Sequence, residues 1–357
     1  MPNFKTNCQP MLVGSLPIKD HDKAMELILE YTPQIPLWPQ LPKYKEEGMV
    51  HQYITGMPGL DICDETLFIN AQGEEFDTDF LAFYEEYLMI TEGGGELDDS
   101  RFTLDSKTAK GFFAFLRHIE KIKDSLIATK AQTTGPFTFA TGVVDHNNKA
   151  IFYNEQLRDA AIKLLALKAK WQIRKMKEIC PQTIMIFDEP AMAGFGSSAF
   201  ITISLDDIKS CFGEVIAAVR EEGGVAGVHV CANTEWSVLF DAGVDLVSFD
   251  AYSYFDRFIL YPEHLKTFFS NGGILASGIV PTIPELLDKE DGDSLTAKWI
   301  TQAEELEKIG IPMEQILQQS LITPSCGTGS ISPEYADRVM SLTRQVSENI
   351  RGHYNLQ

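Results

Sequence analysis

The sequence predicts an α/β protein that folds as one (β/α)8 TIM barrel. Three observations predict this fold. Short apolar segments rich in β-branched residues alternate with longer segments that carry the period of an amphipathic helix. Eight such strand candidates can be counted, which is the number of strands in the barrel. At 357 residues, the chain is also long enough for a barrel, which takes about 250 residues, and for one sizeable insertion.

Each predicted strand is an apolar run that ends at a glycine, a proline or a polar side chain. Strands of parallel sheets are covered on both faces, so their sequences are apolar almost throughout. The predicted strands lie at residues 11–16, 35–40, 127–133, 183–187, 225–230, 246–249, 274–277 and 320–323. Helices with one apolar face are expected between them at residues 24–31, 108–123, 157–177, 205–222, 294–309 and 333–349.

One long stretch, residues 43–103, interrupts this alternation after the second strand. It is rich in Glu, Gly, Tyr and Phe, and it is broken by Met57-Pro58-Gly59 and by three consecutive glycines at 93–95. Loops that follow barrel strands lie at the mouth of the barrel. We therefore expect a hairpin and a helix that form a lid over the mouth, within a single domain spanning residues 1–357.

The composition excludes several classes of partner. The chain carries 51 acidic and 30 basic residues, for a formal net charge of -21. This charge repels phosphate backbones and anionic lipid surfaces, so neither nucleic acid nor a membrane is an expected partner. The first residues lack the apolar core of a secretion signal, and no stretch approaches the roughly 20 apolar residues of a membrane span. We expect a cytoplasmic protein, in which the six scattered cysteines are free thiols or metal ligands.

A histidine and a cysteine one residue apart give the most specific chemical signal. Side chains of a strand alternate between its two faces, so His229 and Cys231 project to the same side and can bind one ion. Cys326 follows the last predicted strand, and the carboxyl ends of all barrel strands meet at one rim. An isolated pair of this kind more often packs in a core. Together with Cys326, however, it predicts a zinc site with an open fourth position, which is typical of catalytic zinc.

Other polar residues end the remaining strands and are expected at the same rim. A carboxylate at Asp188 can pair with an ammonium group or can cap the helix that follows. Asp250 can supply a weak oxygen ligand to the metal, with water as the alternative ligand. Ser15 either contacts the substrate or serves only the tight turn that it forms with Gly14.

Five motifs in order resemble one enzyme family. They are Val-Gly-Ser-Leu-Pro at 13–17, Thr-Gly-Pro-Phe-Thr at 134–138, Asp-Glu-Pro-Ala at 188–191, the His229-x-Cys231 pair and Cys326-Gly327. Over nearly the whole chain, they resemble the catalytic domain of cobalamin-independent methionine synthase and its short single-domain relatives in the uroporphyrinogen decarboxylase superfamily. The resemblance implies zinc held by His229, Cys231 and Cys326, with the remaining ligand from an acidic residue at the position of Asp250.

The same resemblance implies a substrate site. By position, Asp188 would bind the amino group of homocysteine, and Ser15 would contact its amino acid portion. In the family, a glutamate in the stretch that corresponds to residues 47–53 also contacts the amine, and here the matching position holds His51 or Gln52. Asp250 stands where the family usually has a glutamate.

The resemblance also bears on the methyl donor. Full-length methionine synthases of this type carry an additional amino-terminal barrel that helps bind methyltetrahydrofolate, and this sequence contains none. Short relatives take methyl groups from corrinoids carried by a separate protein. The chain has no Asp-x-His-x-x-Gly corrinoid-binding motif of its own. The resemblance therefore implies a methylcobamide donor and a corrinoid protein as partner.

The sequence thus predicts a zinc-dependent S-methyltransferase that acts on a small thiol, with homocysteine as the first candidate and coenzyme M as the second. One alternative is a metal-free decarboxylase like uroporphyrinogen decarboxylase. That class uses arginines near the end of the first strand, whereas the first arginine here is Arg101. Another alternative is a zinc-storage protein that keeps the fold without turnover. No catalytic residue is predicted beyond the metal site.

Overall fold

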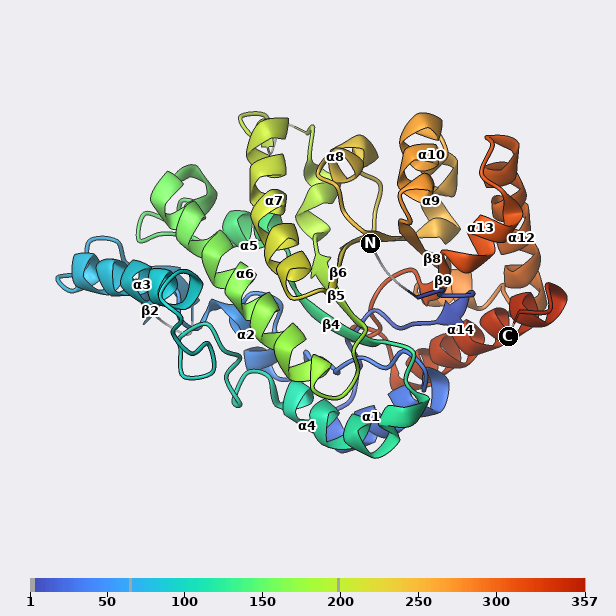
Figure 1. Cartoon of the computed structure of the whole chain (residues 1–357), viewed down its shortest axis with the longest axis horizontal. Coiled ribbons are helices and arrows are strands. Elements are labelled where there is room, and N and C mark those ends of the chain that lie inside the picture. The colour runs from blue at the N-terminus through green and yellow to red at the C-terminus, as the bar shows by residue number, and fades with distance from the viewer. Residues whose placement is uncertain (1–3, 64–65, 198–199, 357) are drawn as a thin grey trace.

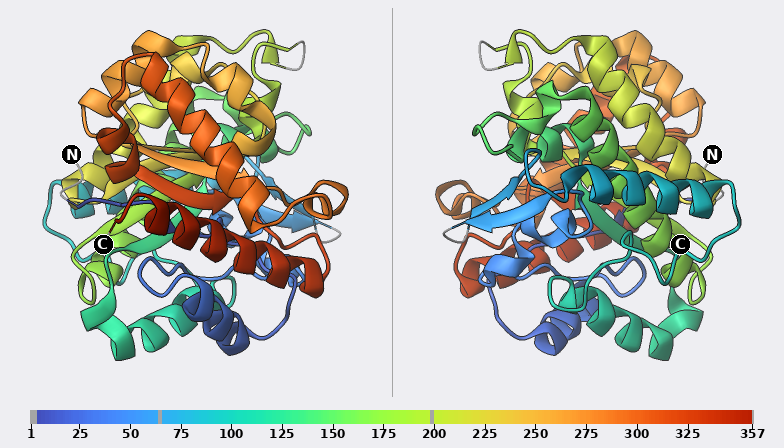
Figure 2. Two further views of the ribbon diagram at one scale, coloured as in Figure 1. Left: turned by 90° about the vertical axis from the view of Figure 1, so that its right-hand side faces the viewer. Right: turned by 90° about the vertical axis from the view of Figure 1, so that its left-hand side faces the viewer.

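The computed structural model describes residues 4–63, 66–197 and 200–356 (Figure 1). Its centre is a curled parallel sheet of seven strands in the order β1-β9-β8-β7-β6-β5-β4, with helices packed around it (Figure 2). The strands are β1 Gln9–Pro10, β4 Thr129–Thr134, β5 Thr183–Asp188, β6 Val225–Val230, β7 Leu246–Phe249, β8 Ile274–Val280 and β9 Ser320–Pro324. The six predicted strands from 127 onward are confirmed, with small differences at their ends.

The first two predicted strands are the exceptions. A regular strand over residues 11–16 is wrong, because β1 contains only Gln9 and Pro10. A strand over 35–40 is also wrong, since this segment makes only isolated bridges, Leu37 with Lys130 and Ser15 with Gln40. Proline has no N–H to donate to a ladder, and the second segment contains two prolines, at 36 and 39. The strand pairing of this segment is therefore limited to one isolated bridge on each side.

Five of the six helices that match a predicted one begin at a capping residue; the helix that begins at Lys110 does not. The side chains of Asp20, Asn154, Ser204, Asp291 and Ser332 each accept a hydrogen bond from a backbone N–H in the first turn of the next helix. The predicted helices correspond to α1 His21–Tyr31, α4 Lys110–Ile119 with the 3-10 turn η2 Glu120–Ser125, α6 Glu155–Lys177, α7 Leu205–Glu221, α12 Gly292–Lys308 and α14 Pro333–His353.

Shorter helices and turns complete the connections. They are η1 Lys45–Glu47, α2 His51–Ile54, α5 Pro136–Gly142, η3 Ile151–Tyr153, η4 Pro190–Gly194, α8 Trp236–Asp241, α9 Ala251–Phe258, α10 Pro262–Ser270, α11 Pro284–Leu287 and α13 Met313–Gln318. Among the helices of the described ranges, none combines the length and the apolar composition that crossing a membrane requires.

The inserted segment contains both elements expected of it. Strands β2 Leu60–Cys63 and β3 Thr66–Ile69 pair as an antiparallel hairpin, and helix α3 Phe76–Thr91 follows. Tyr84 of α3 donates a hydrogen bond of 2.6 Å to Asp159 of α6, so the helix is fastened to the outer helical layer. Figure 1 shows α3 and β2 together at the left edge of the molecule.

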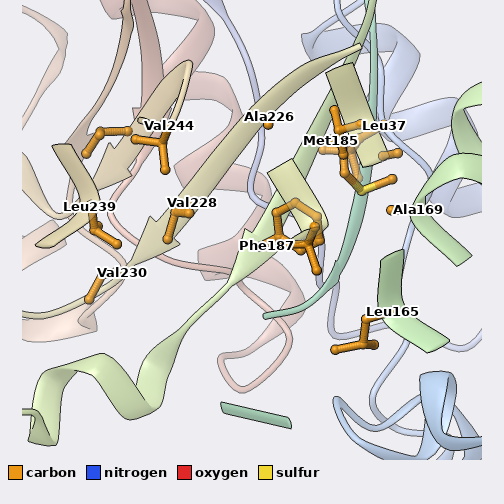
Figure 3. Close-up of a cluster of buried hydrophobic side chains, with 14 of the residues drawn as sticks. Leu37, Leu165, Ala169, Met185, Phe187, Ala226, Val228, Val230, Leu239 and Val244 are labelled. Carbon is orange, nitrogen blue, oxygen red and sulfur yellow. The ribbon is translucent and has the colours of Figure 1, made fainter. Parts of the chain in front are cut away.

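Alternation along the strands sorts side chains between an inner and an outer core. On β6, Val228 and Val230 belong to the large cluster between the sheet and the helices (Figure 3). On β5, Ile184 and Ile186 belong to a second, smaller cluster on the opposite face. Because side chains two residues apart share a face, Asp188 continues the inner face at the carboxyl end of β5.

Gly111 tests how closely α4 packs on the 35–40 segment. A Cβ built at Gly111 would lie 1.9 Å from the Pro39 carbonyl oxygen, so Gly111→Ala forces the helix and the segment apart. We expect this change to lower the free energy of unfolding by about 1–3 kcal/mol, measured by urea denaturation. Gly213→Ala in α7 is the control, because its Cβ would meet nothing within 4 Å, and it should stabilise by about 0.5–1 kcal/mol. Equal effects would contradict the close approach.

Candidate metal centre

The structure brings the three predicted zinc ligands together. The ligand atoms of His229, Cys231 and Cys326 all lie within 4.8 Å of one another. His229 is the penultimate residue of β6, Cys231 directly follows that strand, and Cys326 follows β9. Strands β6 and β9 are separated in the sheet by β7 and β8, whose parallel pairing places all four carboxyl ends at the same edge.

One nitrogen of His229 is held by a hydrogen bond, and the other has no partner. Nδ1 lies 2.9 Å from the Ser248 hydroxyl of β7. Nε2 is buried and, within the described ranges, has no hydrogen-bond partner. A proton on Nδ1 leaves the Nε2 lone pair available, which is the usual arrangement of a metal-binding histidine. The orphaned nitrogen beside two sulfur atoms therefore fits a bound metal.

The two cysteines interact as a pair. A hydrogen bond from the Cys326 thiol, assisted by the neighbouring His229, holds the pKa of Cys231 well below its ordinary value. The same interaction and burial raise the pKa of Cys326. Thiolates are the form in which cysteine binds zinc. These interactions therefore favour the thiolate form of Cys231.

Ser15 fastens the loop that carries Cys326. The Ser15 hydroxyl accepts a hydrogen bond of 3.2 Å from the Gly329 N–H, and its carbonyl accepts one of 3.0 Å from the Thr328 N–H. A Cβ at Gly327 would lie 2.2 Å from the Ser15 hydroxyl oxygen. Ser15 also lines the cavity described below. The Gly-Ser motif at 14–15 and the Cys-Gly motif at 326–327 thus pack directly against each other.

Asp188 points an unpartnered oxygen into the interior. The residue is 8% exposed, and its Oδ1 is buried with no hydrogen-bond partner among the described residues. Burial raises its pKa, while the positive charge of Lys130 on β4 opposes that shift. Lys130 is itself buried, which lowers its pKa to about 8, and it donates to the Val13 carbonyl. An unpaired carboxylate oxygen of this kind is suited to a cationic or hydrogen-bond donor group of a ligand.

Asp250 caps a helix rather than joining the ligand cluster. Its Oδ1 accepts a hydrogen bond of 2.9 Å from the Ser253 N–H at the start of α9. The group of potential metal ligands within 4.8 Å contains His229, Cys231 and Cys326 but not Asp250. Burial raises the pKa of Asp250, and the charges of Cys231 and His229 also act on it. It therefore lies near the centre, with one oxygen already engaged.

Glu189 holds the turn between β4 and α5. Its carboxylate accepts hydrogen bonds from the Phe137 N–H at 2.9 Å, the Thr138 N–H at 2.8 Å and the Thr138 hydroxyl at 2.6 Å. Burial raises its pKa to about 7, and these hydrogen bonds oppose the shift. A Cβ at Gly135 would lie 2.2 Å from the Glu189 carboxylate. The Thr-Gly-Pro-Phe-Thr motif is therefore shaped to receive this buried acid.

A cavity of about 470 Å³ opens beside the ligand cluster. Its lining includes the predicted residues Ser15, Asp188, His229, Cys231 and Cys326. Residues of the inserted segment and of the 35–40 segment also line it. The lining residues that the sequence reasoning did not assign to the site are Val13, Gln40, Pro42, Lys43, Glu47, Met49, Pro190, Gly327, Gly329 and Ser330. The signal for Gln40, Pro42 and Lys43 was their position at or just after the end of the second predicted strand, and Glu47 and Met49 lie in the stretch 47–53 that the family resemblance had singled out.

His51 and Gln52 are not among the residues that line this cavity. Gln52 is 1% exposed, donates a hydrogen bond of 2.7 Å to the Thr108 carbonyl and accepts one of 2.7 Å from Gln40. The Nε2 atom of His51 is buried and has no hydrogen-bond partner in the part of the chain that the structure describes. Gln52 therefore does not line the cavity but is hydrogen-bonded to Gln40, which does.

Two other groups occupy places that the sequence did not predict. Trp38 lies in the 35–40 segment, but its indole N–H donates to Gln172 of α6 and its ring packs on Phe112, so it faces the outer core and not the cavity. Glu47 lines the cavity, and its carboxylate is fully engaged, by His21 at 2.6 Å and by the Leu41 N–H at 2.9 Å. Its role is therefore to fix the loop around it.

No protein-family model matches the chain, and no curated protein is similar to it in sequence. Solved structures with a similar fold include a methyltransferase from Methanosarcina mazei, with a TM-score of 0.50, 13% identity and coverage of 96% of this chain and 98% of that one. A B12-independent methionine synthase from Shewanella sp. W3-18-1, in complex with selenomethionine, has a TM-score of 0.45, 14% identity and 68% coverage of both chains.

A third similar structure is a candidate vitamin-B12-independent methionine synthase from Listeria monocytogenes, with a TM-score of 0.47, 13% identity and 97% coverage of both chains. At these identities the similarity concerns the fold, and the chemistry has to be argued from the site.

Glu189→Gln tests the anchoring of the β4–α5 turn. An amide nitrogen cannot accept the hydrogen bonds that one carboxylate oxygen accepts now, so at least one buried donor loses its partner. We expect the free energy of unfolding to fall by about 1–3 kcal/mol, measured by chemical denaturation. Glu178→Gln, an exposed residue at the end of α6, is the control and should change it by less than about 0.5 kcal/mol. An unchanged stability in Glu189→Gln would contradict the anchoring role.

Proposed function

We propose that this chain is a zinc-dependent S-methyltransferase that transfers a methyl group to a small thiol. The observation that carries the proposal is the cluster of His229, Cys231 and Cys326, whose ligand atoms lie within 4.8 Å of one another beside a cavity. One imidazole and two thiolates with an open fourth position are the ligand set of a catalytic zinc ion. The unpartnered Nε2 of His229 supports a metal at this place.

Zinc bound there would supply one function, which is to make an incoming thiol a thiolate at neutral pH. The chain's own residues position the groups that would bind the zinc. Ser248 orients the imidazole of His229, and Ser15 fixes the loop of Cys326. Asp250, or water, is proposed for the remaining position next to the three ligands. Asp250 lies near them, and a single carboxylate contact is weak enough to yield to substrate sulfur.

The proposed acceptor is a small thiol, with homocysteine, which carries an amino group, as the first candidate and coenzyme M, which carries none, as the second. The unpaired oxygen of Asp188 in the cavity supports an ammonium group in the ligand. Ser15 lines the same cavity, in keeping with a contact to the amino acid portion of the substrate. The arginine-based alternative, a decarboxylase, receives less support, because the lining contains one lysine and no arginine.

The proposed donor is a methylated corrinoid carried by a separate protein. This part of the proposal rests on the family resemblance. In the transfer, the sulfur–carbon bond forms while the cobalt–carbon bond breaks with its electron pair left on cobalt, and the thiol proton is released. Such a displacement depends mainly on holding sulfur and methyl group in line. A cavity that is open to solvent is consistent with a donor that arrives from outside.

We also infer that the scaffold is a complete (β/α)8 barrel with a lid. The 35–40 segment is bridged to β4 on one side and to Ser15 on the other, so it occupies the place of an eighth strand. Three residues early in the inserted segment line the cavity, Lys43, Glu47 and Met49, as does Pro42 directly before the segment. This placement supports a lid formed by residues 43–103 within a single domain.

The metal site is tested by zinc content. The purified protein should hold about one zinc per chain, whereas Cys231→Ser and Cys326→Ser should lose most of it, because each removes one of three protein ligands. Cys63→Ser, which changes an exposed cysteine outside the cluster, is the matched control and should keep the wild-type stoichiometry. Full zinc retention in both ligand variants, measured by atomic emission, would refute the proposed ligands.

The methyl transfer is tested with methylcobalamin and a panel of thiols. The zinc-loaded protein should demethylate methylcobalamin when homocysteine is added, followed by the change in corrinoid absorbance. Asp188→Asn should raise the KM for homocysteine about tenfold or more, because a charge-assisted hydrogen bond is lost, and should leave any reaction with the amine-free coenzyme M unchanged. Absence of turnover with every thiol in the wild type would overturn the proposed reaction.

A further inference from the structure

Gln40 lines the cavity, and its amide is held in one orientation. Its Nε2 donates to the Oε1 of Gln52 at 2.7 Å and to the hydroxyl oxygen of Tyr53 at 3.1 Å. An amide nitrogen has two hydrogens to donate. Both hydrogens of Gln40 are therefore engaged by side chains of α2.

The direction of each hydrogen bond is fixed by a backbone carbonyl. Gln52 donates its own Nε2 to the Thr108 carbonyl at 2.7 Å, and a carbonyl can only accept, so Gln52 must turn its oxygen toward Gln40. Tyr53 donates its hydroxyl hydrogen to the Gln132 carbonyl at 3.0 Å, so its oxygen can only accept from Gln40. Gln52 and Tyr53 are 1% and 0% exposed, and water does not compete for these bonds.

The consequence is that Gln40 must present its oxygen on the opposite side. Within the described ranges, Oε1 receives no hydrogen bond from the protein, and it rests against Gly14, where a Cβ would lie 3.0 Å from it. If the Gln40 amide were flipped, its Nε2 would lie beside Gly14, and its oxygen would face the acceptor oxygens of Gln52 and Tyr53. The network thus leaves Gln40, which lines the cavity, with an oxygen that is free to accept a hydrogen bond.

Asp188 supplies a second free acceptor in the same cavity. Its Oδ1 is buried and unpartnered in the described part of the chain. Gln40 and Asp188 both line this one cavity of about 470 Å³, so a single ligand in it can meet both side chains. A single ligand group that donates to both Gln40 and Asp188 needs at least two hydrogens, and an ammonium group has three.

We propose that Gln40 accepts a hydrogen bond from the ammonium group of an aminothiol substrate, together with Asp188, and that Gln52 is a positioning residue that holds the Gln40 oxygen toward the ligand. This inference rests on the proposed function and extends it, since it makes the amino group a requirement for tight binding. It also gives Gln52 a role that acts through another side chain and needs no direct contact with the substrate.

The experiment compares two thiols that differ only in the amino group, homocysteine and 4-mercaptobutyrate. Their dissociation constants are measured by calorimetry on the zinc-loaded full chain. The wild type should bind homocysteine at least tenfold more tightly than 4-mercaptobutyrate, because hydrogen bonds to a charged group are lost with the amine. Equal affinities would overturn the inference. Failure of the wild type to bind either thiol would overturn the proposed function itself, and the inference with it.

Gln40→Met keeps the length of the side chain and removes the acceptor oxygen, together with the two hydrogen bonds that the amide nitrogen donates to Gln52 and Tyr53. It should weaken homocysteine binding about tenfold and leave 4-mercaptobutyrate binding and the zinc content at wild-type values. Equal weakening of both thiols would mean that Gln40 only shapes the cavity, and would overturn its assignment as an ammonium acceptor.

Gln52→Met tests the positioning role, because it frees the Gln40 amide to turn. Homocysteine binding should weaken several-fold, with 4-mercaptobutyrate again unaffected. An unchanged homocysteine affinity, or an equal loss for both thiols, would overturn the positioning role. A circular dichroism spectrum and a zinc content equal to those of the wild type establish in each case that the variant is folded.

Discussion

The contact between Ser15 and the loop after β9 is the interaction on which the candidate centre depends. His229 and Cys231 are placed by a single strand, whereas Cys326 arrives from the other end of the chain. Its loop is fixed at the cavity because the Ser15 hydroxyl and carbonyl accept backbone hydrogen bonds from Gly329 and Thr328. Glycine at 327 is needed because a side chain there would occupy the space of the Ser15 hydroxyl. Without this contact, the cluster would reduce to two ligands on one strand.

A second constraint concerns unsatisfied polar atoms in a buried setting. A buried donor or acceptor without a partner is costly, so natural structures contain few of them. Here two such atoms gather at one cavity, Nε2 of His229 and Oδ1 of Asp188. Both residues line the cavity together with Cys231, Cys326 and Gln40. This arrangement supports the proposal that the nitrogen binds a metal and that the carboxylate accepts a hydrogen bond from a ligand.

Much of the fold could be predicted from the sequence, because strands buried on both faces leave long apolar runs, as at 183–187 and 225–230. The 35–40 segment was misjudged because an apolar run reads as a strand even where two prolines limit its pairing. The ligand cluster was predictable from the two-residue alternation in β6 and from the shared edge of parallel strands. The helix-capping bond of Asp250 was not, since a carboxylate after a strand suits a cap and a ligand equally. The orientation of Gln40 depends on carbonyls of Thr108 and Gln132, which no sequence pattern reveals.

X-ray absorption at the zinc edge of the purified protein tests the central claim most directly, because it reports the atoms bound to the metal without requiring a substrate. The cluster predicts a spectrum fitted by two sulfur ligands at about 2.3 Å and one nitrogen ligand at about 2.0 Å, with one further light atom. In the zinc that Cys326→Ser still binds when zinc is added in excess, the sulfur contribution should fall by half. A wild-type spectrum that contains only nitrogen and oxygen ligands would contradict a zinc centre built from His229, Cys231 and Cys326.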